Sequence, residues 1–198
     1  MTIFRNVMVT GANQGIGWQL MKDLLPISGR VIATVRTSNA ELEAMKGKVE
    51  NLFVVQYDAT AYDSYDQVVE KVASITAGEG LDLLINNAGI YIRDSLEKVN
   101  PKDMLTNIEV NAVAPLVLTK ALLPQLKASA SSGQKTIVAN ISSQMGSIDD
   151  NKSGGSYAYR SSKAAQNMIS KSLSVDLAPS KIIILALHPG WLQMDMGT

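Results

Sequence analysis

The chain of 198 residues contains no cysteine, which excludes disulfide bonds, thiolate catalysis and zinc sites built on cysteine. It also lacks a surplus of charge, since 18 Lys and Arg face 18 Asp and Glu. A chain without net charge has no basic stripe for nucleic acid or for an anionic membrane surface, so we expect neither partner. Nothing in the sequence predicts a bound metal.

Long hydrophobic runs are missing as well. The longest, Ala112 to Leu118 and Ile182 to Leu187, are much shorter than the ~18 residues that a transmembrane helix needs. The N-terminus shows no apolar stretch followed by a small-residue cleavage site, so no signal peptide is expected. We therefore expect a cytoplasmic protein. The content of 46% hydrophobic and 18% charged residues predicts one domain with one core over residues 1–198.

Short runs of β-branched residues alternate with longer segments of helical period. One such segment places Ile16, Leu20 and Leu24 on a single helix face. This alternation predicts an α/β protein, a three-layer, doubly wound Rossmann fold with a mostly parallel sheet covered on both faces. The expected strands are Asn6–Thr10, Arg30–Val35, Leu52–Tyr57, Leu81–Ile85, Thr136–Ile141 and Lys181–Leu187.

Three glycines lie where the first predicted strand runs into the first helix, within Thr10–Gly17. Glycine permits a tight turn and lets backbone N–H groups approach a pyrophosphate, whose charge the start of a helix favours. The segment therefore predicts a dinucleotide site, although glycines can also serve only to turn a strand into a helix.

Five motifs in order resemble the short-chain dehydrogenase/reductase family. They are the T-G-x-x-x-G-I-G loop at 10–17, Asn-Asn-Ala-Gly at 86–89, Asn-Ile-Ser-Ser at 140–143, Tyr-x-x-x-Lys at 159–163 and Pro-Gly at 189–190. Segments 140–148 and 154–163 are most similar to the sniffer and C-factor type carbonyl reductases of that family. The resemblance covers essentially the whole chain and implies an NAD(P)-dependent oxidoreductase.

Arg36 stands near the end of the second strand, where an acid that binds the adenosine ribose is common. A guanidinium can bind a phosphate through two hydrogen bonds, which favours NADP over NAD. Many NADP-dependent relatives also carry a basic residue in the glycine loop, where this chain has Gln14. The alternative is a solvated surface arginine.

The resemblance implies a catalytic group of four residues, Asn111, Ser143, Tyr159 and Lys163. Tyr159 and Lys163 are spaced to share a helix face, so the ammonium is expected to lower the phenol pKa. Ser143 is expected to bind the substrate carbonyl oxygen, with the neighbouring Ser142 as the alternative.

Asn111 lies in an expected helix over Asp103–Leu126 that also contains Pro115. Because proline has no N–H for the Asn111 carbonyl, we expect a kink there that leaves an acceptor for a water. The resemblance makes this water part of a proton relay, and the alternative is a kink without chemistry.

The resemblance further implies contacts with the cofactor from the glycine loop, the ends of the next three strands, the catalytic pair and the Pro-Gly turn. Met194 stands where relatives have a threonine that bonds the nicotinamide, and we assign His188 no chemical role. The implied cofactor contacts are Gly11, Asn13, Gln14, Gly15, Ile16, Gly17, Arg36, Asp58, Ala59, Asn87, Ala88, Gly89, Tyr159, Lys163, Pro189, Gly190, Trp191 and Leu192.

The expected reaction is NADPH-dependent reduction of a ketone, aldehyde or quinone to an alcohol. One alternative is a cofactor-binding signalling or regulatory protein of the C-factor kind, in which turnover is incidental. A sugar epimerase or dehydratase is disfavoured, because such relatives space their glycines as G-x-x-G-x-x-G and need a larger substrate domain. Relatives commonly pair the helices corresponding to Asp103–Leu126 and Ser156–Leu177, so we expect a homodimer through them; alternatively, each helix buries only its sheet-facing stripe.

Relatives also continue well beyond the Pro-Gly turn. We therefore expect this chain to be a shortened or incompletely observed version of a longer protein, without a seventh strand and a helical substrate lid. Ile182–Leu187 would then form an apolar sheet edge. An intact mass near 21.2 kDa would contradict this expectation.

Overall fold

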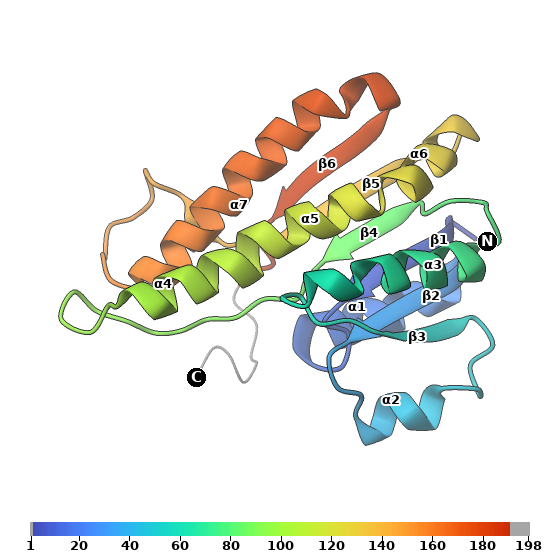
Figure 1. Ribbon diagram of the computed structural model, residues 1–198, viewed down its shortest axis with the longest axis horizontal. Coiled ribbons are helices and arrows are strands. Elements are labelled where there is room, and N and C mark those ends of the chain that lie inside the picture. Colours follow the sequence, from blue (N-terminus) through green and yellow to red (C-terminus); the bar gives the residue numbers. More distant parts are fainter. Residues whose placement is uncertain (1, 191–198) are drawn as a thin grey trace.

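A computed structural model describes residues 2–190, which form one six-stranded sheet with helices on its faces (Figure 1). All strand pairs are parallel and the order is β3-β2-β1-β4-β5-β6. The predicted fold and its six strands are confirmed, with small shifts at the strand ends. The strands are β1 (Phe4–Thr10), β2 (Ser28–Val35), β3 (Leu52–Gln56), β4 (Leu83–Asn86), β5 (Thr136–Ile141) and β6 (Ile182–Leu187).

The direction of winding reverses between β1 and β4. The chain moves outward from β1 through β2 to β3, and then returns to the far side of β1 to place β4, β5 and β6. In open parallel sheets, ligands bind beyond the carboxyl ends of the strands at such a reversal. The glycine loop after β1 and the Asn-Asn-Ala-Gly segment after β4 therefore lie side by side.

Side chains alternate across the sheet and form two cores. On one face Met8, Ile32 and Leu84 pack under α3, α5, α6 and the end of α7. On the other face Val9 and Ile85 pack with α1 and α2. The longer helices are α1 (Gly15–Leu24), α2 (Ala40–Met45), α3 (Tyr65–Thr76), α4 (Pro101–Ile108), α5 (Ala114–Ala121), α6 (Leu123–Ser131) and α7 (Tyr157–Asp176). Figure 1 shows α4, α5 and α7 together on one side of the sheet.

The expected cover of both faces is incomplete at β6. Ile182 and Ile184 face the core under α7, whereas Ile183, Leu185 and Leu187 point away from it and are 43%, 38% and 41% exposed. Within residues 2–190, β5 is the single neighbour of β6. This strand is thus an apolar edge in the part of the chain that the structure describes.

The helical segment expected over Asp103–Leu126 is divided. It begins earlier with α4, passes through a π-helical turn at Glu109–Val113 and continues as α5. The turn contains Asn111, where the missing N–H of Pro115 predicted an irregularity. A second interruption at Leu122 separates α5 from α6 and was not predicted; Pro124, at the start of α6, explains it in the same way.

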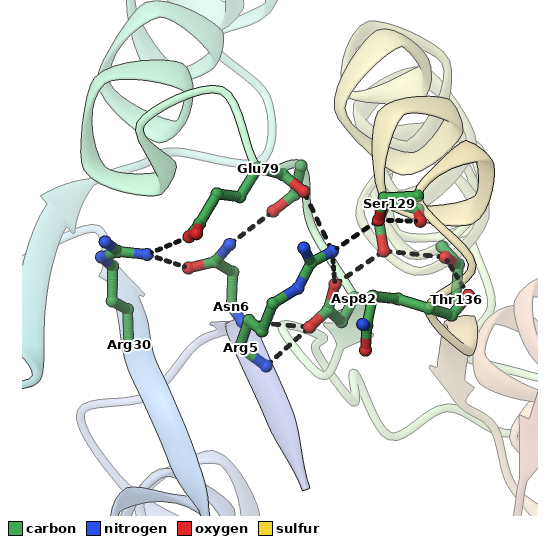
Figure 2. A network of polar contacts seen from close by, with 10 residues as sticks. Arg5, Asn6, Arg30, Glu79, Asp82, Ser129 and Thr136 are labelled. Carbon is green, nitrogen blue, oxygen red and sulfur yellow. Dashed lines mark hydrogen bonds and ion pairs between the residues drawn. The ribbon is translucent and has the colours of Figure 1, made fainter. Parts of the chain in front are cut away.

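A network of polar contacts joins β1, β4 and β5 at the amino ends of the strands, opposite the glycine loop (Figure 2). Asp82 precedes β4 and is 1% exposed. Its carboxylate accepts hydrogen bonds from the backbone N–H of Arg5 at 2.6 Å, from the Arg5 guanidinium at 3.1 Å and from the Ser129 hydroxyl at 2.6 Å. Ser129 also contacts Thr136 at the start of β5 at 2.9 Å. The buried acid is therefore well hydrogen-bonded and fixes β1 beside β4 and β5.

No helix within residues 2–190 is both long and apolar enough to cross a membrane. Over the same range, histidine and acidic side chains form no group of three or more that could hold a metal ion.

Candidate active site

The glycine loop is tightly packed where β1 ends and α1 begins. Gly11 and Gly15 have φ of +66° and +54°, the left-handed region that favours glycine. A Cβ on Gly17 would lie 2.2 Å from the Gly11 carbonyl oxygen and 2.4 Å from Asn87 Nδ2. These positions need glycine for backbone geometry and close packing, and the loop leaves a cradle at the N-terminus of α1 that suits a pyrophosphate.

Asn87 and Ala88 hold the glycine loop from the neighbouring strand. The Asn87 side chain donates to the carbonyl oxygens of Thr10 at 2.9 Å and Gly11 at 3.2 Å. The backbone N–H groups of Asn87 and Ala88 each donate to the Thr10 hydroxyl at 2.9 Å. The Asn87 amide thereby shapes the glycine loop itself, and the contact of Asn87, Ala88 and Gly89 with the cofactor stays a prediction.

Asn13 and Asn39 attach the same loop to the segment after β2. Asn13 Nδ2 donates to the Thr37 carbonyl oxygen at 3.1 Å, and the Asn39 side chain donates to the Asn13 carbonyl oxygen. Asn39 also caps α2 by accepting from the Leu42 N–H at 2.7 Å. Gln14 and Gly15 are exposed at the tip of the loop, and Ile16 is half-buried behind it.

Arg36 and Asp58 lie beyond the ends of β2 and β3, and the Arg36 guanidinium is exposed. The Asp58 carboxylate accepts from the Thr60 N–H at 2.9 Å and from the Thr60 hydroxyl at 3.0 Å. These bonds, and the charge of Arg36, lower the pKa of Asp58. Tyr65 fixes the same turn by donating to the Ala59 carbonyl oxygen at 2.7 Å. The exposed Arg36 and the Asp58 carboxylate therefore lie beyond neighbouring strand ends, where they could bind an adenosine phosphate and its base.

Lys163 is buried on α7, with 5% of its surface exposed. Its Nζ donates to the Ile141 carbonyl oxygen at 2.7 Å and to Gln166 Oε1 at 3.1 Å, and lies 5.7 Å from the Tyr159 ring centroid. Burial lowers the pKa of Lys163 to about 8. The structure thus brings the predicted Tyr159–Lys163 pair together on one face of α7.

The pKa of Tyr159 does not follow the sequence prediction. Burial raises the phenol pKa, and the neighbouring Ser143 hydroxyl offsets part of that rise. Lys163 Nζ lies 5.7 Å from the Tyr159 ring centroid, and burial outweighs any lowering of the phenol pKa. The expected lowering by Lys163 is therefore absent from this structure, and the phenol is fully protonated at neutral pH.

Ser143 and Ser142 follow β5 with different environments. Ser142 is 6% exposed and donates to Asn167 Oδ1 at 2.6 Å, so its hydroxyl is turned into the fold. Ser143 is half-buried beside Tyr159 and accepts from the Met145 N–H at 3.1 Å. Of the two candidates left by the sequence, Ser143 is the one that lies beside the phenol.

Asn111 lies in the π-helical turn and is 1% exposed. Its side chain accepts from the Ile90 N–H at 2.8 Å and donates to the Ile90 carbonyl oxygen and the Ser162 hydroxyl, both at 2.9 Å. Asn111 therefore joins the segment after Gly89 to α7, one residue from Lys163. Gly89 lies close by, and a Cβ there would lie 3.0 Å from Asn111 Oδ1.

Three further residues of the site were missed by sequence reasoning. Asp94 accepts from the N–H groups of Tyr157 at 2.6 Å and Ala158 at 2.9 Å, and so caps α7. Tyr91 packs against Tyr159 with the two rings tilted and their centroids 4.7 Å apart. Gln166 binds Lys163. Asp94 and Tyr91 are distant from α7 in sequence, so no local pattern could connect them to it.

The segment between β5 and α7 is attached to α7 by Arg160. Arg160 Nε donates to the Gly155 carbonyl oxygen at 3.2 Å, and its NH2 donates to the Ser153 hydroxyl at 2.9 Å. Gly146 packs against the same helix, where a Cβ would lie 2.8 Å from the Lys163 carbonyl carbon. These contacts hold the segment beside Tyr159.

The turn after β6 contains His188, Pro189 and Gly190, which are all exposed; Gly190 has a φ of +81°. The expectations for Trp191, Leu192 and Met194 lie outside the described residues.

Comparison with known proteins identifies the family, since a model of the short chain dehydrogenases matches residues 5–198. The chain belongs to the short-chain dehydrogenase family. The structure of the carbonyl reductase Sniffer of D. melanogaster aligns with a TM-score of 0.94 and 37% identity, covering 98% of this chain and 84% of that one. An NADPH-bound carbonyl reductase from chicken fatty liver gives 0.94 and 38%, covering 100% and 83%.

A third relative is the C-signal protein of Myxococcus xanthus, which is 46% identical over 118 residues, 59% of this chain and 69% of that protein. The predicted membership of the short-chain dehydrogenases, and the similarity to sniffer-type carbonyl reductases, are confirmed. This short-chain dehydrogenase is therefore an oxidoreductase.

Proposed function

We propose that this oxidoreductase reduces a ketone, aldehyde or quinone to the alcohol, using NADPH. The observation that carries the proposal is the position of the protonated Tyr159 phenol, which lies beside the Ser143 hydroxyl and on the same helix face as Lys163. A carbonyl oxygen that accepts from both hydroxyls would have one group to stabilise its developing charge and one to supply a proton.

The cofactor assignment rests on residues at the reversal of the sheet. The tightly packed glycine loop would hold the pyrophosphate at the start of α1, and the exposed Arg36 would bind a ribose phosphate. Support comes from the chicken carbonyl reductase, whose structure contains NADPH. When bound, NADPH supplies the hydride, and Met194 would leave the nicotinamide without the threonine contact of its relatives.

Each residue of the proposed tetrad has a distinct task. Ser143 donates to the carbonyl oxygen, Tyr159 transfers its proton to that oxygen, and Lys163 binds the cofactor ribose and supplies charge near the phenolate that forms. Asn111 holds the segment after Gly89 against α7 and connects Lys163 to solvent through a water at the π-helical turn. The proton lost from Tyr159 is thereby replaced.

The reaction is tested by following NADPH oxidation with a panel of ketones, aldehydes and quinones. Turnover of at least one class supports the proposal. Tight NADPH binding without turnover across the panel would instead favour the second candidate, a cofactor-binding signalling or regulatory protein. The similarity to the protein named C-signal is the observation that favours this alternative.

We further propose that the protein is a homodimer through the outer faces of α5 and α7. An apolar groove of about 310 Å³ lies there, lined by Leu116, Met168, Ile169 and Leu173 among others, and Met168 is 66% exposed. A two-fold pairing would cover this groove with the same surface of the second copy. Light scattering should give twice the monomer mass for the unmodified protein and the monomer mass for Met168→Glu.

The cytoplasmic location stays a prediction.

A further inference from the structure

Lys163 stands out among the buried groups of the fold because a buried ammonium needs acceptors for its protons. The described contacts of its Nζ are the Ile141 carbonyl oxygen at 2.7 Å and Gln166 Oε1 at 3.1 Å. The first is a backbone group at the end of β5, which any residue would provide. The second depends on the side chain at position 166.

Within residues 2–190, the polar partner described for the Gln166 side chain is Lys163. Gln166 is 2% exposed and points into the interior from the face of α7 that packs on the sheet, a position where an aliphatic side chain would suit the fold. Its side-chain carbonyl lies one helical turn from Lys163, within reach of that ammonium. A buried glutamine is retained at low cost only when it is hydrogen-bonded, and Lys163 is its partner.

Among the residues that the structure describes, no carboxylate forms an ion pair with Lys163. Tyr159 on the same helix is the titratable group that contacts it, and that phenol is protonated. The neighbouring segments contribute the Ile141 carbonyl from β5 and the backbone of Gly146. Glu109 of the π-helical turn interacts instead with Tyr62. Burial is accordingly the cause of the lowered pKa of Lys163.

We propose that Gln166 is a positioning residue that keeps Lys163 charged and aimed at the active site by accepting a hydrogen bond from its ammonium. Two fixed acceptors, one from β5 and one from α7, define where Nζ lies and leave its remaining proton for the active site. The role in catalysis rests on the proposed function, because it acts through Lys163. The effect of Gln166 on the charge and position of Lys163 does not depend on the proposed function.

The test measures protonation of Lys163 directly, in the cofactor-free protein, by NMR titration of ¹³C-labelled lysine side chains. The signal is assigned by its loss in Lys163→Arg. Gln166→Leu should lower the titration midpoint by about one pH unit, because a hydrogen bond to a charged group is lost. Gln166→Glu should raise it by a similar amount, since a carboxylate favours the charged lysine.

Ser170→Ala is the matched control, because Ser170 is buried one turn further along α7 and contacts Asn140 and the Gln166 backbone carbonyl rather than the lysine side chain. Its midpoint should equal that of the unmodified protein. If Gln166→Leu does not fold, the isosteric Gln166→Glu decides. Equal midpoints in the folded Gln166 variants and the unmodified protein would overturn the proposal.

The pH dependence of kcat/KM provides a second measurement. The alkaline loss of activity should move to lower pH in Gln166→Leu and to higher pH in Gln166→Glu. Shifted NMR midpoints in a protein without reductase activity would refute the proposed function and leave the pairing of Gln166 with Lys163 intact. Shifted activity profiles with unchanged NMR midpoints would refute the pairing.

Discussion

The carboxylate of Asp94 accepts the backbone N–H of Tyr157 at 2.6 Å, and so fixes the start of the helix that carries Tyr159 and Lys163. The same carboxylate accepts from Ala158 at 2.9 Å, and the Asp94 carbonyl oxygen accepts from the Ser156 N–H at 3.1 Å. Ser156 itself has a left-handed φ of +48°. The segment after β4 thus holds both the glycine loop and the catalytic helix.

Replacing Asp94 with alanine should lower the free energy of unfolding by about 1–2 kcal/mol, because two N–H groups at the start of α7 lose their partner. Turnover should fall as well, since Tyr159 lies in the first turn of that helix. Urea unfolding and NADPH oxidation measure the two effects. Asp149→Ala, in an exposed part of the loop before α7, is the control; a result for Asp94→Ala equal to it would contradict the capping role.

Gly17→Ala should destabilise the glycine loop by about 3 kcal/mol or more, because the new Cβ would lie 2.2 Å from a carbonyl oxygen of the backbone. NADPH affinity should fall with it. Gly47→Ala separates this clash from backbone strain, because Gly47 has a φ of +77° and open space around it. The Gly47→Ala control should lower the free energy of unfolding by only about 1 kcal/mol. Similar losses in both variants would show that close packing at Gly17 is unimportant.

Arg36→Ala should weaken NADPH binding by roughly ten- to a hundredfold while leaving NADH binding almost unchanged, since one charge-assisted contact with a phosphate is removed. Titration calorimetry with both cofactors measures the difference. Lys171→Ala removes an exposed charge from α7 and should change neither affinity. A protein that prefers NADH, with or without Arg36, would overturn the assignment of NADPH.

The buried Lys163 should make stability depend on pH in the alkaline range. Its pKa is about 8 in the folded protein and near 10.5 when unfolded, so between these values the unfolded chain binds more protons. The folded state therefore becomes relatively more stable as pH rises through that window. Lys163→Met removes the free-energy cost of burying the charged ammonium, which is on the order of 3 kcal/mol below pH 8.

Urea unfolding of the unmodified protein and Lys163→Met at several pH values provides the comparison. We expect the difference in free energy of unfolding between the two proteins to change by about 3 kcal/mol between pH 7 and pH 10.5, because only the unmodified protein gains stability over that range. A gap that stays constant over this range would show that Lys163 does not titrate with a lowered pKa.

The six strands and the fold were predictable because their signals are local. Buried parallel strands such as Thr136–Ile141 are short runs rich in β-branched residues. The glycine spacing at 11–17 likewise lies within one short continuous segment. The irregular turn at Asn111 was predictable for the same reason, since the absent N–H of Pro115 acts on a carbonyl four residues earlier.

The missed features depend on contacts between distant segments. Asp94 caps α7 across 63 residues of sequence, and Tyr91 meets Tyr159 only because β4 and β5 are neighbours. The pKa of Tyr159 was predicted with the wrong sign because spacing on a helix does not reveal burial, which here raises the phenol pKa. The hydrogen bonds of Lys163 to Ile141 and Gln166 could not be predicted from the local sequence either.

The most direct test of the proposed function is the rate of NADPH oxidation by Tyr159→Phe, with Tyr157→Phe as the control. Tyr157 is 38% exposed at the start of the same helix, so its loss should change neither rate nor affinity. Tyr159→Phe should lower kcat at least ~100-fold, because the proton donor is removed, while NADPH binding is nearly unchanged. Full turnover by Tyr159→Phe would contradict the account.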